Sequence, residues 1–136
     1  MKGCRIGNPF ALGVTDMGHV TGIGGLFFRA RDPGVLANWY ARHLGITPPG
    51  SDLWQQQAGG TVFSPFAQGS DYFAADKQWM LNLRVQGLAG MIAALRDDGI
   101  AVETRAEWDG DGSYGSFARI HDPEGNPIEL WQPPAA

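Results

Sequence analysis

The chain has 136 residues, the size of one ordinary domain, which argues against two independently folded domains. Hydrophobic residues make up 43% of it and charged residues 18%, a balance typical of a folded protein and not of a disordered one. The net charge is -4 and no run of Lys or Arg occurs, so we expect no nucleic-acid surface. The single cysteine, Cys4, cannot form a disulfide within the chain, and no N-terminal apolar stretch is long enough for a signal peptide or a membrane span. We therefore expect a cytoplasmic protein without a membrane segment.

The first half of the chain predicts a strand, a helix and two further strands. Residues 24–32 alternate between apolar and other side chains, which is typical of a strand. Asp32 and Pro33 suit the N-cap and first position of a helix that ends at Gly45. Residues 52–57 and 61–66 then predict two strands joined by a turn at Gly59-Gly60.

The second half repeats this order. Residues 79–85 alternate like a strand, and residues 88–95 have helical spacing that stops at Gly99. When the halves are aligned, Gly45 matches Gly99 with one inserted residue, which indicates an internal duplication. We expect one domain over residues 20–136, made of two modules over about 20–75 and 76–133, preceded by an N-terminal arm over residues 1–19.

The closing segment, His121-Asp-Pro-Glu-Gly-Asn-Pro-Ile-Glu-Leu-Trp131, together with the two copies, resembles the vicinal oxygen chelate superfamily of glyoxalases, bleomycin-resistance proteins and ring-cleaving dioxygenases. The resemblance covers Val20 to Pro133. It implies an α+β fold in which two tandem βαβββ modules form a curled mixed sheet around an open cleft, with the helices on the outside. It also implies a homodimer, since two-module chains of this superfamily commonly pair and symmetric dimers are the commonest oligomers.

In metal-using members of this superfamily, each module supplies one ligand on its first strand and a Glu on its last strand. The matching positions here are Gly25, Met80, Phe63 and Glu129, so one of four is a ligand for a hard divalent ion. Catalytic metal sites normally have about three protein ligands, so we predict no metal and no other cofactor. The alternative is a divalent ion (Zn, Ni, Mn or Fe), because a slip of one residue in a strand would turn different side chains inward.

Strand alternation also predicts which side chains line the cleft. The predicted set is mostly apolar and suits a small hydrophobic or aromatic molecule held by one or two charges: Phe27, Arg29, Phe63, Met80, Asn82, Arg84, Glu129 and Trp131. Arg29 and Arg84 occupy equivalent positions of the two modules, so they could flank a carboxylate, phosphate or enolate oxygen. The alternative is that they form structural ion pairs with Glu129 or another neighbour.

Glu129 has two interpretations. As a catalytic base it would take a proton from a carbon next to a carbonyl, with an arginine holding the resulting oxyanion. As a structural residue it would pair with Arg84 or Arg29. Of the histidines, His121 is predicted to be a solvent-facing strand end, and His43 to interact with a helix dipole.

Two loops are candidate lids over the cleft, residues 67–78 and residues 108–114, because Gly and Asp make both polar. The second contains Asp-Gly-Asp-Gly but lacks the other ligands of a calcium loop, so we interpret it as a turn.

Two classes of function follow. The first is a glyoxalase/bleomycin-resistance-like protein that binds a small molecule in an apolar cleft without the family metal. The second is a lyase, isomerase or dioxygenase that uses Glu129 with or without a divalent metal. Loss of three ligand positions favours the first class, although this fold supports many reactions.

Overall fold

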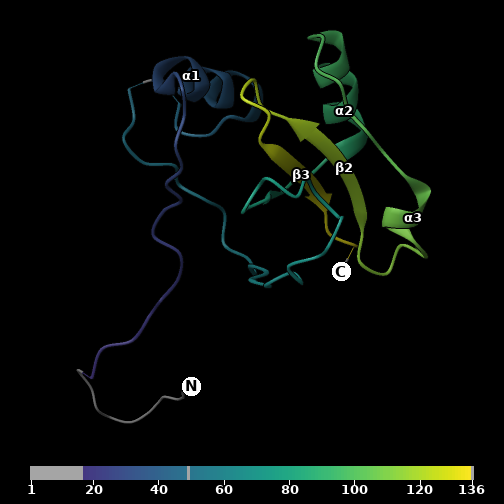
Figure 1. Cartoon of the computed structure of the whole chain (residues 1–136), viewed down its shortest axis with the longest axis horizontal. Coiled ribbons are helices and arrows are strands. Elements are labelled where there is room, and N and C mark those ends of the chain that lie inside the picture. The colour runs from purple at the N-terminus through teal and green to yellow at the C-terminus, as the bar shows by residue number, and fades with distance from the viewer. Residues whose placement is uncertain (1–16, 49, 136) are drawn as a thin grey trace.

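The computed structural model describes residues 17–48 and 50–135, and over these residues the chain is an α+β fold with a small mixed sheet (Figure 1). The α+β class predicted from the sequence is confirmed. The elements in chain order are α1 (Pro33–Leu44), β1 (Leu81–Arg84), α2 (Leu88–Asp97), α3 (Ala106–Asp109), β2 (Ser116–His121) and β3 (Pro127–Gln132). Residues 1–16 of the predicted N-terminal arm lie outside the described residues.

Helix α1 has the ends that its sequence predicts. The Asp32 carboxylate accepts a hydrogen bond from the Val35 backbone N–H at 3.1 Å, and Pro33 occupies the first turn. Gly45 ends the helix in the left-handed conformation with a φ of 68°, which glycine adopts without steric cost. The inner face of the helix buries Leu36 and Tyr40.

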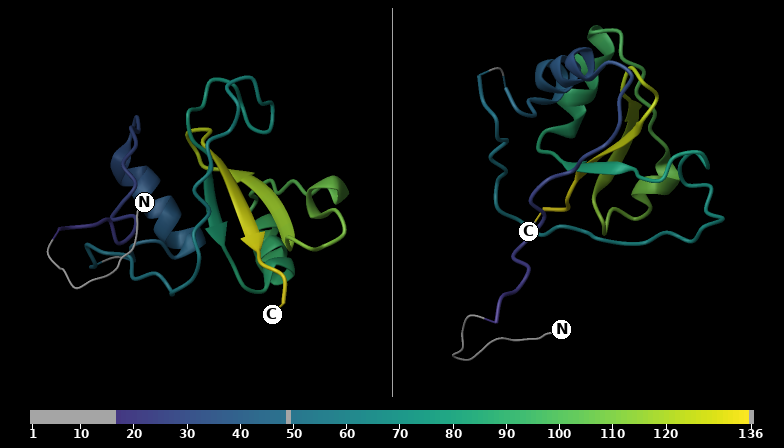
Figure 2. Two further views of the ribbon diagram at one scale, coloured as in Figure 1. Left: turned by 90° about the horizontal axis from the view of Figure 1, so that it is seen from below. Right: turned by 60° about the vertical axis from the view of Figure 1, so that its left-hand side comes forward.

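The sheet has β3 in its centre, with β1 parallel to it on one side and β2 antiparallel on the other. The left panel of Figure 2 shows this sheet with α2 and α3 in one part of the molecule, and α1 with the N-terminal segments in the other. Alternation along the strands sends one set of side chains into the core. The buried apolar residues are Leu36, Tyr40, Leu83, Leu88, Leu95, Ala118, Ile120, Ile128 and Leu130.

The opposite face of the sheet carries polar and aromatic side chains in two rows that cross all three strands. The first row, here called the polar row, consists of Asn82, Glu129 and Arg119, which are direct partners in the strand register. The second row consists of Arg84, Trp131 and Phe117, and the last two rings stack with their planes 11° apart. Residues of one row therefore point the same way, away from the apolar core.

The turn between β2 and β3 fastens the sheet to α1. Asp122 is only 4% exposed and accepts hydrogen bonds from the Tyr40 hydroxyl at 2.7 Å, the Asn126 amide at 2.8 Å, and the backbone N–H groups of Glu124 and Asn126. Glu124 accepts the backbone N–H groups of Arg31 and Asp32, which precede α1. The closing motif is thus a structural anchor as well as a turn.

The first half differs from its prediction. Residues 24–32, 52–57 and 61–66 are extended but form no strand in the described structure, so the strands predicted there are corrected. A strand needs a neighbour for its backbone N–H and C=O groups, and the single chain places none beside these segments. Their apolar side chains stay in solvent: Phe27 is 94% exposed and Phe63 is 79% exposed. Over residues 17–48 and 50–135, the second half of the chain forms a sheet and the first half contributes no strand to it.

None of the helices in the described part of the chain combines the length and apolar character that a membrane span requires.

Candidate functional site

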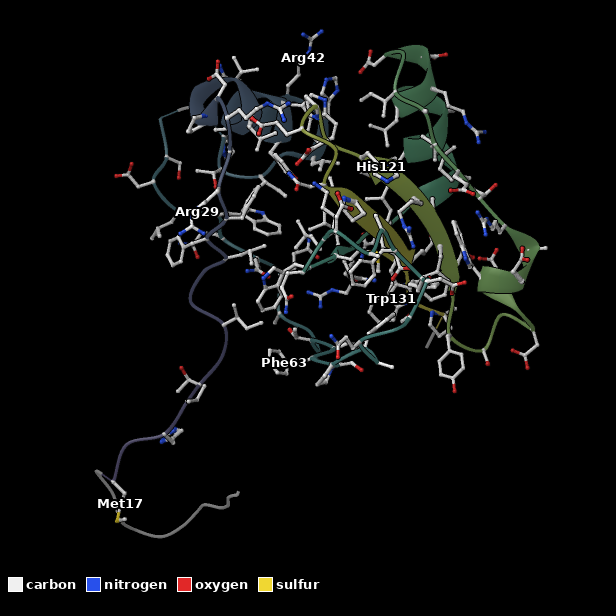
Figure 3. All side chains as sticks on the ribbon, in the orientation of Figure 1. Met17, Arg29, Arg42, Phe63, His121 and Trp131 are labelled. Atoms are coloured by element: carbon white, nitrogen blue, oxygen red, sulfur yellow. The ribbon has the colours of Figure 1, made fainter. Side chains whose placement is uncertain are left out.

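An open groove of about 2230 Å³ lies between the extended N-terminal segments and the β1 side of the sheet. Six of the eight predicted cleft residues line it, namely Phe27, Phe63, Met80, Asn82, Arg84 and Trp131. Further aromatic lining comes from Trp54, Phe66 and Trp79. Figure 3 labels Phe63 on an extended segment and Trp131 on the sheet. The lining combines aromatic and aliphatic side chains with polar ones such as Gln55, Gln57 and Lys77. The groove is larger than a closed site for one small molecule, which has about 300 to 1,000 Å³.

The two arginines of the predicted cleft do not flank a common point. Arg29 lies on the extended segment before α1, apart from the sheet that carries Trp131 (Figure 3), and does not line the groove. Arg84 lines the groove but donates hydrogen bonds to the backbone carbonyls of Gly60 and Gln57, each at 2.8 Å. A Cβ at Gly59 would lie 2.7 Å from the Arg84 guanidinium carbon, so glycine permits this crossing. Arg84 therefore holds the segment around residue 59 against the sheet.

Glu129 lies behind the groove wall, in the centre of the polar row. Its side chain is buried, with the residue 7% exposed, and accepts a hydrogen bond from the Asn82 amide at 2.7 Å and another from the Tyr72 hydroxyl. Among the described residues it forms no ion pair with Arg29 or Arg84, the partners that its structural interpretation expects. Both carboxylate oxygens are instead occupied by neutral donors.

Tyr72 belongs to residues 66–78, here called the covering segment, which passes over the polar row. A turn closed by the Ser70 N–H to the Ala67 carbonyl, and a bond from the Tyr72 N–H to the Ser70 hydroxyl, set the backbone there. The phenol ring then lies between Phe66, 5.6 Å away by ring centroids, and Trp108, at 6.3 Å. Burial, followed by the bond to Glu129, raises the pKa of Tyr72 from 10.0 to about 12, so the hydroxyl stays protonated and donates.

Arg119 completes the polar row and was missed by the sequence reasoning. Its residue is 7% exposed, and its guanidinium carbon lies 5.0 Å from the Tyr72 ring centroid and 5.2 Å from that of Trp108. One terminal nitrogen donates to the Tyr72 carbonyl at 3.2 Å, while the buried Nε has no acceptor among the described residues. A buried cation packed between two aromatic rings, with a donor left unpaired, is the feature of this site that most needs a partner.

A signal for Arg119 is present in the sequence. The turn that ends with Asn126 joins β2 and β3, and each pair of facing residues lies the same number of positions before and after Glu124 in the sequence. Arg119 and Glu129, each five positions from Glu124, therefore face each other. Strand β2 has the required alternation, with Ala118 and Ile120 on the core face, but it had not been predicted as a strand.

The residues at this site do not fit the divalent metal that the family resemblance implies. Glu129 is the one carboxylate of the polar row, and its oxygens are occupied by Tyr72 and Asn82. Across residues 17–48 and 50–135, no three His, Cys, Asp or Glu side chains lie together as a set that could hold an ion.

The loop over residues 108–114 is a helical turn followed by a tight turn. Asp109 accepts the Phe117 N–H at 3.0 Å, and Asp111 accepts the Ser113 N–H at 2.9 Å. Helix α3 positions Trp108 against Arg119 on one side and Arg105, 5.1 Å from the ring centroid, on the other. The role of α3 at the site is therefore to hold Trp108 against Arg119 of the polar row.

Comparison with known proteins gives a similarity to a solved structure. No protein-family model matches the chain, and no curated protein matches it. Among solved structures, the chain is similar to the antibiotic-binding protein TnmS3 from Streptomyces sp. CB03234, with 23% sequence identity and a TM-score of 0.49. The match covers 85% of this chain and 99% of that chain. Membership of the vicinal oxygen chelate superfamily therefore stays a prediction.

Proposed function

We propose that this chain is a glyoxalase/bleomycin-resistance-like binding protein that takes an aromatic or hydrophobic small molecule into the groove, without the family metal and without changing the molecule chemically. The observation that carries this proposal is the lining of the groove. Aromatic side chains from the N-terminal half face a sheet wall that offers the Asn82 amide, the Arg84 guanidinium and the Trp131 ring. Such a lining binds an apolar body and orients it with few polar contacts.

The alternative, a lyase, isomerase or dioxygenase acting through Glu129, has less support. A general base must come within hydrogen-bond distance of the proton that it removes. Glu129 does not line the groove, and its oxygens already accept from Tyr72 and Asn82.

The proposal includes a homodimer. Each chain would consist of two βαβββ modules, over residues of about 20–75 and 76–133, preceded by an arm over residues 1–19. A second copy would supply the strand neighbours that residues 24–32 and 61–66 lack, and would cover exposed side chains such as Phe27 and Val62. It would also reduce a groove of about 2230 Å³ to the volume of an ordinary ligand site. The single Cys4 fits a cytoplasmic location, where disulfides are rare.

The dimer is tested by light scattering coupled to size-exclusion chromatography. We expect the mass of two chains for the wild type and of one chain for Phe27→Asp. Val35→Asp is the matched control, since Val35 is also exposed but lies on α1 outside the groove lining. A wild-type mass of one chain contradicts the dimer.

Binding is tested with a panel of planar aromatic acids, phenols and polycyclic antibiotics, by thermal shift and by quenching of tryptophan fluorescence. Phe63→Ser should weaken binding about tenfold, the effect of losing one apolar side-chain contact, while Val35→Ser should leave it unchanged. If no compound of the panel raises the melting temperature, or if the two variants behave alike, the groove is not the binding site that we propose.

A further inference from the structure

The side chains packed around Tyr72, at the edge of the groove, stand out because part of the protein is bound among them as a ligand would be. The phenol ring packs against the Arg119 guanidinium, its hydroxyl donates to Glu129, and its edges contact Phe66 and Trp108. These contacts supply a cation, an acceptor and apolar walls to one aromatic ring.

The polar row adjoins the groove. Asn82 lines the groove and also donates to Glu129, so the groove wall and the buried carboxylate share one residue. Trp131, two residues along β3 from Glu129, lines the groove as well. Removal of the Tyr72 ring would therefore extend the groove across β3 to β2.

The present occupant leaves one requirement unmet. Arg119 Nε is a buried donor without an acceptor among the described residues, and the Tyr72 side chain offers it no second oxygen beside the hydroxyl that already serves Glu129. An unpaired buried donor destabilises the site, so an occupant with an additional acceptor oxygen would be held more strongly.

The attachment of the covering segment makes exchange feasible. In the described structure, the side-chain hydrogen bonds between residues 66–78 and the sheet all involve Tyr72. Its hydroxyl donates to Glu129, and its backbone carbonyl accepts from Arg119. The other backbone hydrogen bonds of this segment in the described structure close turns within it, at Ala67–Ser70 and Ala74–Lys77. Release of this one residue frees the segment from the polar row.

We infer that the polar row is a binding subsite for a hydroxyaryl carbonyl or carboxylate compound, whose hydroxyl donates to Glu129 and whose adjacent oxygen accepts from Arg119, and that Tyr72 occupies this subsite until the ligand displaces it. The inference rests on the proposed small-molecule binding and adds the chemical class of the ligand. The subsite selects the ligand by its two oxygens, and the groove accommodates the rest of the molecule.

The probe is 1-hydroxy-2-naphthoate, compared with 1-methoxy-2-naphthoate, which keeps the size and the carboxylate but lacks the donor. We expect the hydroxy compound to bind the wild type at least tenfold more tightly. Tyr72→Ala should bind it about tenfold more tightly than the wild type, because a site blocked by its own side chain for most of the time binds with reduced apparent affinity. Arg119→Lys should weaken the binding of both naphthoates, since both carry the carboxylate that Arg119 would hold, with Arg42→Lys and Tyr114→Phe as matched controls outside the site.

Displacement is observed directly by fluorine NMR of protein labelled with 3-fluorotyrosine. The chain has three tyrosines, Tyr40, Tyr72 and Tyr114, so each signal is assigned by one Tyr→Phe variant. We expect the probe to move the Tyr72 signal and leave the Tyr40 and Tyr114 signals in place.

The outcomes separate this inference from the proposed function. Equal binding of both naphthoates with an unmoved Tyr72 signal overturns the inference while binding in the groove stands. Weaker binding by a folded Tyr72→Ala overturns it too, since Tyr72 is then part of the wall. If the wild type binds neither compound and Tyr72→Ala binds the hydroxy compound alone, the subsite is supported and the groove proposal fails. If no variant binds either compound, both fail.

Discussion

Two tyrosine–carboxylate pairs of this protein use the same chemistry in different surroundings. Tyr40 donates to Asp122 and Tyr72 donates to Glu129, and both carboxylates are buried. Asp122 accepts four hydrogen bonds, and these join α1 to the turn before β3. Glu129 accepts two, its tyrosine lies on the covering segment, and the neighbouring Arg119 keeps an unpaired Nε. The Tyr40–Asp122 pair, whose surroundings in the described structure leave no buried side-chain donor unpaired, indicates a structural anchor. The Tyr72–Glu129 pair, which lies beside a groove and an unpaired Arg119 donor, indicates a place for a ligand.

The largest difference between the pairs should appear when the carboxylates are changed. Asp122→Ala leaves two backbone N–H groups and the Tyr40 hydroxyl without an acceptor, and should lower the free energy of unfolding by about 3 kcal/mol. Glu129→Gln keeps an amide oxygen, and the Tyr72 hydroxyl can turn to accept from the new NH₂ group, so about 1 kcal/mol or less is expected. Urea unfolding followed by circular dichroism measures both. Equal losses would contradict the distinction between anchor and ligand site.

A smaller difference is expected when the hydroxyls alone are removed. Tyr40→Phe takes a donor from a buried carboxylate and should destabilise the fold by about 1 to 2 kcal/mol. Tyr72→Phe removes a bond at a half-buried loop residue and should destabilise it by less than about 1 kcal/mol. The same unfolding experiment applies, and trypsin cleavage after Lys77 gives a second measure. Cleavage should accelerate in Tyr72→Phe and not in Tyr40→Phe.

Alkaline pH should weaken both pairs. Burial, and then the hydrogen bond to the carboxylate, raises the pKa of each tyrosine above its ordinary value of 10.0, for Tyr72 to about 12. A group whose pKa is raised by folding stabilises the fold fully below its unfolded pKa, and that contribution is lost as the pH rises through the folded value. We expect the unfolding midpoint to fall between pH 10 and 12, and to fall less in Tyr72→Phe. The same slope in the variant and the wild type would show that this hydroxyl does not contribute.

The smallest effect is expected at Glu124, on the anchor side of the comparison. The backbone N–H groups of Arg31 and then Asp32 lower the pKa of this exposed carboxyl below 4.5. A group whose pKa is lowered by folding stabilises the fold above its unfolded pKa, and the contribution is lost as the pH falls through the lowered value. Glu124→Gln should therefore lose part of the acid-side decline in melting temperature and match the wild type in ligand binding. A variant whose melting temperature declines as steeply as that of the wild type below pH 4.5 would contradict this.

Local signals were sufficient for α1 and for much of the second half of the chain. The caps at Asp32 and Gly45 predicted α1, and period-two alternation placed Leu83 and Leu130 on the core face with Asn82 and Glu129 opposite. These features depend on neighbours a few residues away or on burial of one strand face.

The predictions that failed concern features that depend on a residue or strand distant in the sequence. The alternation in residues 24–32 and 61–66 predicts strands, but alternation states which face is apolar and not whether a neighbour is present. The internal duplication predicted Arg29 and Arg84 as the cations near Glu129, whereas in the structure strand β2 brings Arg119 beside Glu129. Tyr72 reaches Glu129 across 57 residues of sequence, a contact that no local pattern indicates.

The position of β3 has a consequence for how the chain folds. It is the central strand of the sheet and also the last of the described elements in chain order, so neither β1 nor β2 has its main partner until residues 127–132 have been synthesised. The attachment of helix α1 to the sheet also forms late. Tyr40 and the Arg31 backbone bind Asp122 and Glu124, which lie 82 and 93 positions further along the chain. Contacts so distant in sequence slow folding. Formation of the sheet should therefore be a late and slow step in the folding of this protein.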